Sequence, residues 1–568
     1  DILSKRKEQS GKSKVEDIVA LLLKNRGLET KKEIEEFLHP PDPFLLTPGA
    51  VGIDKTALGK ALKRIVEAIT KKESIVVYAD YDADGITAGA IMWETIYQMG
   101  GHVMPYIPHR VEEGYGLSLK GLDAVAAQYD PSLIITVDHG ITAKDKVAYA
   151  KKLGIDVIVT DHHVKPDALP TCTIVHTTKL SGSGVSWFVA KELVKKMKEQ
   201  REKGEGDEIL ALAAIGTIAD MVPLIGPNRS VSKYGLAAMN KTTRVGLTAL
   251  IEEAGLTKGT LGTYDVSHVL APRLNAMGRI EHALDALRLL CTKRPDKARD
   301  LAQKLNLTNK ERQQMTELSS LHAKDFARGL SKKKLLIIAH ESYNQGIIGL
   351  VAGKLVEEFY RPAIVIAKGE TISKASARSI AGFNIIEAIR KNSDILVDAG
   401  GHPMAAGFTV ETKYLALLEE RLSALAEKEL DDEALTRQLR IDMEIPLGAV
   451  GIELWQALHA FAPYGFGNPE PIFMTRDVTV GDVRLVGADG KHLKLRILNQ
   501  ACLPARQESL RPGSGQARIM VEAIGFGLGQ YYAKLNSEKH VDVAYAIDMN
   551  QWNGSRRLQL KLKDIHIL

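Results

Sequence analysis

The chain has 568 residues, of which 45% are hydrophobic and 26% are charged, and its formal net charge is only +5. This composition excludes disordered and fibrous proteins, and at roughly 150 residues per domain the length predicts three or four globular domains. No apolar stretch approaches the roughly 20 residues that cross a bilayer, so we expect no membrane association.

The N-terminal stretch DILSKRKEQS lacks a signal-peptide core, and Cys172, Cys291 and Cys502 form no CxxC pair. These features predict a cytoplasmic protein without a disulfide framework or a thiolate metal site. Because the net charge is small for this length, any nucleic-acid surface is expected to be a local patch.

Residues 1–45 are expected to be helical, since apolar residues recur at three-to-four spacing up to Pro40. From residue 46 to 265, short β-branched runs alternate with helical stretches. The runs SIVVYAD, SLIITVDHG and DVIVTDHH are apolar throughout, as strands covered on both faces are. This alternation predicts an α/β domain with a doubly wound parallel sheet.

Each of these runs leads directly into acidic or histidine residues. Ligands of open α/β sheets bind beyond the carboxyl ends of the strands, so we expect these side chains to converge there. A fourth apolar run, ALAAIGTIAD, is interpreted as another acidic strand end. The expected cluster consists of Asp80, Asp82, Asp84, Asp138, Asp161, His162, His163 and Asp220.

The sequence of the second half of the chain predicts a connector and two further domains. Residues 266–329 are rich in polar residues and are expected to form a helical connector. A strand, glycine-loop, helix and strand pattern predicts a second, smaller α/β domain at 330–430. In residues 431–568 the segments HLKLRIL, VDVAYAI and RLQLKLKDI alternate apolar and polar residues, which predicts a small β-barrel of the OB-fold type.

The acidic cluster predicts a metal site. A solvated acidic turn is the alternative for a lone DxDxDG stretch, but several carboxylates packed together repel one another and need a cation. Hard ions such as Mg²⁺ and Mn²⁺ take carboxylate oxygens, and imidazole favours Mn²⁺. With this many ligands two ions about 4 Å apart are expected, an arrangement that hydrolyses phosphoesters.

The ordered motifs DYDADG, VDHG, TDHH and GTIADMVPL resemble the four motifs of the DHH phosphoesterase superfamily, and within it those of single-strand-specific 5′→3′ exonucleases. The resemblance covers nearly the whole chain. SARSIAGFNI and AGGHPMAAGFTV are similar to the DHH-associated domain, and APYGFGNPEPIF and VGADGKHLKL are similar to the C-terminal OB-fold. It implies release of 5′-mononucleotides from single-stranded DNA in repair and recombination, with helicases or single-strand-binding proteins as partners.

The resemblance also implies roles for single residues, with Asp138 as the bridge between two Mn²⁺ or Mg²⁺ ions. Asp80 is either a ligand or a hydrogen-bond partner of the loop, and His163 either contacts the scissile phosphate or is a buried structural histidine. The implied metal ligands are Asp80, Asp82, Asp84, Asp138, His162 and Asp220. The implied catalytic residues are His163, Arg273 and Arg279.

A further set of residues is expected to hold the DNA strand. The alternatives are a basic strand edge for the KASARS stretch, a tight turn for His402, and a salt-bridged loop for Arg110 and Tyr115. The residues of this set are Arg110, Tyr115, Asn275, Gln313, Lys374, Ser376, Arg378, Ser379 and His402. In the barrel, Lys491, His492, Lys494 and Arg496 suit a DNA-binding groove or an ordinary solvated strand.

Two departures from the superfamily pattern concern the substrate side. His139 follows the second-motif aspartate and is either an extra ligand or a supporting partner, and the segment after His163 is short. Two alternative functions stay open: a phosphodiesterase for cyclic dinucleotides or short oligoribonucleotides, and a non-catalytic replication scaffold. The additional C-terminal barrel favours a polymeric substrate, and the full ligand set disfavours the scaffold.

Overall fold

The computed structural model describes residues 15–110, 112–197, 205–330, 332–498, 520–552 and 555–568, so Cys502 and the first 14 residues lie outside the description. The chain divides into two compact units. The larger contains residues 46–220 and 234–438, and the smaller contains the chain up to Leu45, residues 221–233 and residues 439–568. Within the described ranges, every helix is too short or too polar to span a membrane.

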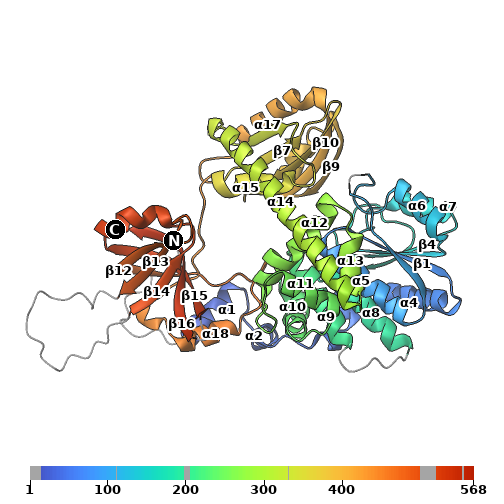
Figure 1. Cartoon of the computed structure of the whole chain (residues 1–568), viewed down its shortest axis with the longest axis horizontal. Helices are drawn as coiled ribbons and strands as arrows, with labels where there is room; N and C mark the ends of the chain where they lie inside the picture. Colours follow the sequence, from blue (N-terminus) through green and yellow to red (C-terminus); the bar gives the residue numbers. More distant parts are fainter. Residues whose placement is uncertain (1–14, 111, 198–204, 331, 499–519, 553–554) are drawn as a thin grey trace, which may run out of the picture. The chain divides into compact units, whose positions relative to one another are not determined.

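The larger unit begins with a five-stranded parallel sheet of order β2-β1-β3-β4-β5. Helices α6 and α7 cover one face, and α4, α5 and α8 cover the other, which explains the continuous apolar strands (Figure 1). The predicted doubly wound domain is confirmed. Its elements are α3 (Pro48–Val51), α4 (Lys55–Thr70), β1 (Ser74–Ala79), α5 (Ala83–Gln98), β2 (His102–Tyr106), α6 (Leu119–Tyr129), β3 (Leu133–Val137), α7 (Lys144–Lys152), β4 (Asp156–Asp161), β5 (Thr173–His176) and α8 (Gly182–Met197).

The strand order indicates where on this sheet a ligand is expected to bind. The chain runs from β1 outward to β2 and then returns to β3 on the other side of β1, so the order reverses between β1 and β3. Ligands of doubly wound sheets bind at such a switch point, beyond the carboxyl ends of the strands. Asp80 and Asp138 follow directly after β1 and β3.

The prediction of a fourth strand end at Asp220 was wrong, because the run before it is helical. It forms most of α9 (Glu205–Ala219). Residues 209–218 are all buried, so the run has no polar face from which a helical period could be read.

Helices connect the two α/β domains. A π-helical segment, Asp265–Leu270, leads into α12, and the 35-residue α14 is about 52 Å long at 1.5 Å per residue. The connector contains α12 (Ala271–Ile280), α13 (Leu284–Cys291) and α14 (Pro295–Gly329), and it is preceded by α10 (Gly226–Met239) and α11 (Val245–Glu253).

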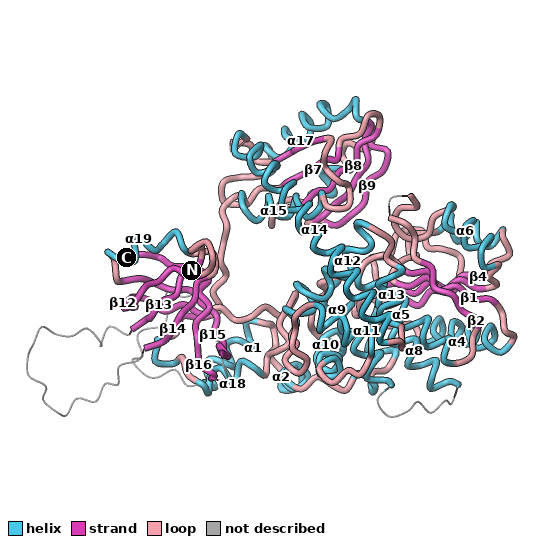
Figure 2. The backbone as a smooth tube through the Cα atoms, viewed as in Figure 1, coloured by secondary structure: helices cyan, strands magenta, loops and turns pink. Residues whose placement is uncertain are grey.

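The second α/β domain has a mixed sheet of order β6-β7-β8-β10-β9, in which only β6 and β7 are parallel. Helices α14 and α15 cover one face, and α16 and α17 cover the other (Figure 2). Its elements are β6 (Leu336–His340), α15 (Ile348–Phe359), β7 (Ala363–Ala367), β8 (Ile372–Arg378), α16 (Ile385–Arg390), β9 (Leu396–His402), β10 (Ala405–Glu411) and α17 (Leu415–Glu429).

The smaller unit contains the predicted barrel, closed by pairing of β12 with β15 (Figure 2). The N-terminal helices pack into the same core as the barrel strands, with Ile18, Leu22 and Phe37 among its buried residues. The elements are α1 (Val15–Asn25), α2 (Lys31–Leu38), β11 (Met443–Glu444), α18 (Ile452–His459), β12 (Phe473–Val486), β13 (His492–Leu498), β14 (Met520–Gly525), α19 (Tyr532–Ser537), β15 (His540–Trp552) and β16 (Ser555–Ile567).

Candidate active site

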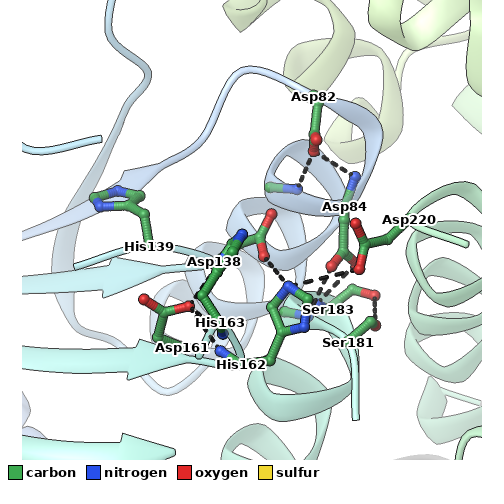
Figure 3. Close-up of polar contacts among 12 residues, drawn as sticks. Asp82, Asp84, Asp138, His139, Asp161, His162, His163, Ser181, Ser183 and Asp220 are labelled. Carbon is green, nitrogen blue, oxygen red and sulfur yellow. Dashed lines mark hydrogen bonds and ion pairs between the residues drawn. The ribbon is translucent and has the colours of Figure 1, made fainter. Parts of the chain in front are cut away.

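Two helix N-termini hold the first carboxylates of the cluster. Asp82 caps α5, and its Oδ1 accepts hydrogen bonds from the backbone N–H groups of Asp84 and Gly85, both at 3.0 Å. The Asp84 carboxylate accepts from the N–H groups of Gly182 at 2.7 Å and Ser183 at 3.0 Å, at the start of α8. Helix N-termini stabilise negative charge, so these bonds fix both carboxylates (Figure 3).

Asp138 follows β3 with φ of 67°, an uncommon value for a residue with a side chain. Its N–H donates to the carbonyl of Thr160 at 3.0 Å, so β4 holds its backbone. Gly182 lies directly against the Asp138 carboxyl group, and a Cβ at that position would overlap with it. The start of α8 therefore positions both Asp84 and Asp138.

A turn after β4 presents two neighbouring histidines together. The buried Asp161 Oδ1 accepts hydrogen bonds from the N–H of His162 at 2.7 Å, the N–H of His163 at 3.1 Å and His163 Nδ1 at 2.8 Å. The two ring centroids lie 4.5 Å apart. His162 Nε2 lies 3.1 Å from Asp138 Oδ1 and 3.5 Å from Asp220 Oδ2 (Figure 3). The chain turns here, so the two histidines do not point in opposite directions as they would within a strand.

Asp161 and His163 shift each other's pKa in opposite directions. Burial alone would raise the pKa of Asp161, but its hydrogen bonds with His163 and the backbone lower that pKa well below its ordinary value. Burial opposes charge on His163, yet the hydrogen bond and charge of Asp161 raise its pKa. This pairing favours a protonated His163 whose Nδ1 faces Asp161.

The cluster contains groups of three side chains whose ligand atoms lie within 4.8 Å of one another. These groups are Asp138, His162 and His163; Asp84, His162 and Asp220; and Asp80, Asp82 and Asp138. The last two groups share no residue. Among the described residues, the buried atoms Asp80 Oδ1, Asp138 Oδ1 and His162 Nε2 have no partner with hydrogen-bond geometry. Buried polar atoms nearly always have a hydrogen-bond partner. Because these oxygen and nitrogen atoms accept no hydrogen bond, and because Mg²⁺ and Mn²⁺ bind such atoms, they fit as ligands of a divalent cation.

Repulsion among the carboxylates changes their ionisation. Burial raises the pKa of Asp80, Asp82 and Asp138, and the neighbouring carboxylates raise it further. Burial, followed by the charges of the other aspartates, raises the pKa of Asp220 to about 9. Without a cation, these groups therefore tend to bind protons at neutral pH, and a bound cation would displace them.

Three residues near the cluster have clear contacts. The half-exposed Tyr115 places its hydroxyl 3.3 Å from His163 Nε2. Asn275 Oδ1 accepts a hydrogen bond from the Ala83 N–H at 2.7 Å, so this residue supports the start of α5. His139 Nε2 lies 3.0 Å from the carbonyl oxygen of Tyr78, and burial lowers the pKa of this histidine to about 4. His139 belongs to none of the three groups of candidate ligands found in the described part of the chain.

Arg279 lies within electrostatic range of three other arginines and of Asp82. Burial lowers the pKa of Arg279 to about 10, and the positive charges of Arg110, Arg312 and Arg378 add to this effect, whereas Asp82 opposes it. Burial and the charge of Arg110 also lower the pKa of Arg378. Such a concentration of positive charge is stabilised by an anion, and a phosphate group supplies the oxygens that guanidinium groups bind.

The second domain adds a helix N-terminus to this arginine cluster. Arg378, at the end of β8, donates from Nη1 to Ser376 Oγ at 3.3 Å. A Cβ on Gly349, in the first turn of α15, would lie 2.9 Å from Ser376 Oγ and 3.0 Å from Arg378 Nη2. A guanidinium so close to the positive end of a helix is favourable when an anion lies between them.

The other residues that were expected to bind DNA or to act in catalysis belong to neither the acidic cluster nor the arginine cluster. Lys374 shares the outer face of β8 with Ser376, whereas the buried Ser379 hydroxyl donates to the carbonyl of Phe383 at 2.7 Å. Gln313 and His402 are exposed. Arg273 donates to Asn306 Oδ1 at 3.2 Å and to the carbonyl of Val269 at 2.7 Å.

Sequence reasoning missed two features of the site. Arg312 adjoins Gln313 in KERQ, and only the packing of α14 shows that the arginine joins the cluster. The GSG run at 182–184, which follows the short segment after His163, begins α8, and the N–H groups of Gly182 and Ser183 bind Asp84. Glycine and serine at a helix start are a signal for such anion binding.

Comparison with known proteins agrees with this architecture. The family models that match are the DHH family N-terminal domain at residues 74–217, the DHHA1 domain at 332–431 and the RecJ OB domain at 441–564. The fold and the acidic cluster define a phosphoesterase of the DHH family. The single-stranded-DNA-specific exonuclease RecJ of Bacillus subtilis is 35% identical over 96% of this chain and 67% of the relative, and that of Salmonella typhimurium is 30% identical over 96% and 95%. The chain belongs to the RecJ family.

Solved structures give the same result. RecJ from Thermus thermophilus in complex with Mn²⁺ matches with a TM-score of 0.78 and 29% identity, covering 97% of this chain and 76% of that one. Another structure, of exonuclease RecJ bound to manganese, matches with a TM-score of 0.58 and 33% identity over 66% of this chain and 95% of that one.

Replacing Gly182 with alanine is expected to weaken Mn²⁺ binding by about 10- to 100-fold, because the new Cβ displaces the Asp138 carboxyl group. Calorimetric titration with Mn²⁺ measures the effect. Gly59→Ala is the matched control, since a Cβ there meets no atom within 4 Å. Unchanged Mn²⁺ affinity in Gly182→Ala would contradict the assigned position of Asp138.

The stability of the metal-free protein is expected to depend on Asp220. Its pKa is about 9 in the folded chain and about 3.9 when unfolded, so the folded state binds an extra proton between these values and loses relative stability as the pH rises. Asp220→Asn should therefore unfold at a higher temperature than the wild type at pH 8 in EDTA, with a smaller difference near pH 5. A wild type that is the more stable at pH 8 would overturn this assignment.

Proposed function

We propose that the chain is a metal-dependent exonuclease that removes nucleotides from the 5′ end of single-stranded DNA. The observation that carries the proposal is the closeness of two complementary clusters. In one, the buried oxygens Asp80 Oδ1 and Asp138 Oδ1 accept no hydrogen bond, and the other consists of arginines around Arg279, whose charge is affected by Asp82 of the first. The RecJ relatives are named for activity on single-stranded DNA, and two of the solved structures contain manganese.

The proposed ligands of Mn²⁺ or Mg²⁺ are Asp80, Asp82, Asp84, Asp138, His162 and Asp220. When bound, such ions activate water and stabilise charge on the leaving oxygen of a phosphodiester. The protein contributes rigid ligand positions, because backbone N–H groups hold Asp82 and Asp84 and the neighbouring strand holds Asp138.

His163 is proposed to contact the scissile phosphate. Asp161 holds Nδ1, which leaves Nε2 directed toward the hydroxyl of the half-exposed Tyr115. The raised pKa of His163 favours the imidazolium form, whose Nε2–H can donate a hydrogen bond to a phosphate oxygen. Tyr115 is then placed to contact the same nucleotide.

The arginine cluster is proposed to select the strand end. Arg110, Arg279, Arg312 and Arg378 together with Ser376 suit a terminal phosphate, which carries more charge than a phosphodiester. DNA strands generally end in a 5′-phosphate and a 3′-hydroxyl, so a terminal-phosphate site beside the metal ligands favours cleavage from the 5′ end. Arg279 is thus proposed as a substrate-binding group near the reacting phosphate.

Supporting residues are assigned from their contacts. Asn275 is proposed to position the start of α5, and Arg273 to hold Asn306 of α14, close to Arg312. Lys374, Gln313 and His402 are exposed and are proposed to contact the DNA backbone without sequence preference. Helicase and single-strand-binding partners and the cytoplasmic location stay predictions.

The barrel is proposed to bind DNA by base stacking more than by charge. Several basic residues in the described part of the barrel are paired with acids, as in Arg484–Asp482, Lys491–Asp489 and Lys494–Glu522. Phe526, directly after β14, is 59% exposed and lies with its ring centroid 5.3 Å from that of His492. The second and third strands of OB-folds bind oligonucleotides, and exposed aromatic rings stack on bases.

The central experiment follows a single-stranded DNA oligonucleotide labelled at its 3′ end, with Mn²⁺ or Mg²⁺. The wild type should shorten it progressively from the 5′ end, and Asp138→Ala should lower the rate by about 100-fold or more. Asp145→Ala, an exposed aspartate on α7, should cleave like the wild type. Intact DNA with both metals would exclude the proposal and direct attention to cyclic dinucleotides and short oligoribonucleotides.

A second experiment tests end recognition. Arg378→Ala should reduce kcat/KM on 5′-phosphorylated DNA by about 10- to 100-fold, as expected for loss of a charge-assisted hydrogen bond, and should change it little on 5′-hydroxyl DNA. Arg390→Ala, at an exposed position of the same domain, is the control. Equal losses on the two substrates would show that Arg378 does not read the terminal phosphate.

A further inference from the structure

Asp220 lies at the covalent junction of the two units. It is the last residue of one segment of the larger unit, and Met221–Lys233 belongs to the smaller unit before the chain returns at Tyr234. Met221 has φ of 58°, a value that costs energy for a residue with a side chain. A candidate metal ligand is therefore adjacent to the point where the chain enters the barrel's unit.

Within the smaller unit, Arg229 holds this segment in place. Its side chain is buried, with 1% exposed, and donates to the carbonyls of Phe37 at 2.6 Å, Ala462 at 2.9 Å, Ala460 at 3.3 Å and Pro463 at 3.4 Å. These bonds tie α10 to the end of α2 and to the segment that precedes the barrel. Buried carbonyls without a donor are costly, so the four bonds define one arrangement of these three parts.

A glycine-rich stretch contacts the residues directly after Asp220. The Leu224 N–H donates to the carbonyl of Phe466 at 2.8 Å. A Cβ on Gly465 would lie 2.7 Å from Leu224 Cδ1, and a Cβ on Gly467 would lie 2.8 Å from Pro223 Cβ. The APYGFGNPE motif, assigned from the sequence to the OB-fold region, therefore packs against residues 223–224.

The end of α9 before Asp220 and the part of α10 from Tyr234 onward belong to the larger unit, and they pack tightly against each other. The Asp220 N–H donates to the carbonyl of Gly216 at 2.9 Å, which continues α9 to the aspartate. Farther along α10, Gly235 lies so close to Ala214 and the carbonyl of Leu210 that a Cβ would overlap with α9. A displacement of residues 221–229 would consequently act on the Asp220 backbone.

We propose that Arg229 is a positioning residue for Asp220. Arg229 and the 460–467 segment hold residues 221–229 in the barrel's unit, and this restraint sets the position of the Asp220 carboxylate among the metal ligands. The inference rests on the proposed function, because it requires Asp220 to bind metal. The barrel's unit thereby contributes to metal affinity, independently of any contact that it makes with DNA.

The test measures Mn²⁺ affinity of the full chain by calorimetry, together with thermal unfolding. Arg229→Ala should weaken Mn²⁺ binding by about 10- to 100-fold and lower kcat without a matching rise in KM for DNA. Because loss of Arg229 can impair folding, Gly467→Ala is the second variant, in which the new Cβ pushes Pro223 away. It should weaken Mn²⁺ binding in the same direction.

Arg26→Ala is the matched control. Arg26 donates to Asn468 Oδ1 at 3.0 Å and to the carbonyl of Pro469 at 2.8 Å, so it ties the same segment to α1. This variant should lower the unfolding temperature and keep the wild-type Mn²⁺ affinity. Wild-type affinity in a folded Arg229→Ala or Gly467→Ala protein, or an equal loss in Arg26→Ala, would overturn the inference.

The same titrations separate this inference from the proposed function. Asp220→Asn provides the reference for loss of the ligand itself. If the wild type bound no Mn²⁺, the proposed metal-dependent function would fail, and the inference with it. If the wild type bound Mn²⁺ and Asp220→Asn bound it equally well, only the role of Asp220, and hence that of Arg229, would be excluded.

Discussion

Repulsion among buried carboxylates is the constraint on which the catalytic domain depends. Burial and mutual charge raise the pKa of Asp80, Asp82, Asp138 and Asp220, so the cluster is costly in its ionised form without a cation. The fold offsets part of this cost locally, since the N-termini of α5 and α8 donate to Asp82 and Asp84. Asp80 Oδ1 and Asp138 Oδ1 accept no hydrogen bond, and these are oxygens that a divalent ion would take.

A second concentration of like charge, formed by arginines, lies near these carboxylates. Arg279 is half-buried within electrostatic range of other arginines, and Asp82 is the carboxylate that offsets their charge. A phosphate chain relieves both problems, because its oxygens are acceptors for guanidinium groups and ligands for metal ions. The site is therefore better suited to the end of a phosphodiester chain than to an uncharged substrate. A scaffold without activity would need neither the buried metal ligands nor the adjacent arginines, so the DNA exonuclease is the preferred function.

The division of the chain into units falls directly after a candidate metal ligand, Asp220. Residues 221–233 belong to the unit that contains the barrel, although they follow Asp220 directly and precede helices of the catalytic unit. Arg229 holds that segment through backbone carbonyls, which are the same for any side chain in the partner segments. This explains why the arrangement leaves no obvious signal in the sequence apart from closely spaced glycines.

The sequence by itself determined the order of the domains, the parallel sheet and most of the acidic cluster. It could do so because strands covered on both faces are continuous apolar runs, and because side chains after parallel strands meet at one edge. Tertiary structure alone decided the helical nature of the run before Asp220, whose burial on all sides removes the periodic signal. It also decided which polar residues serve the site: Arg312 joins the arginine cluster, Asn275 supports α5 and the Ser379 hydroxyl bonds to its own loop. These outcomes depend on which distant segments pack together, and residue type and local spacing carry no record of that packing.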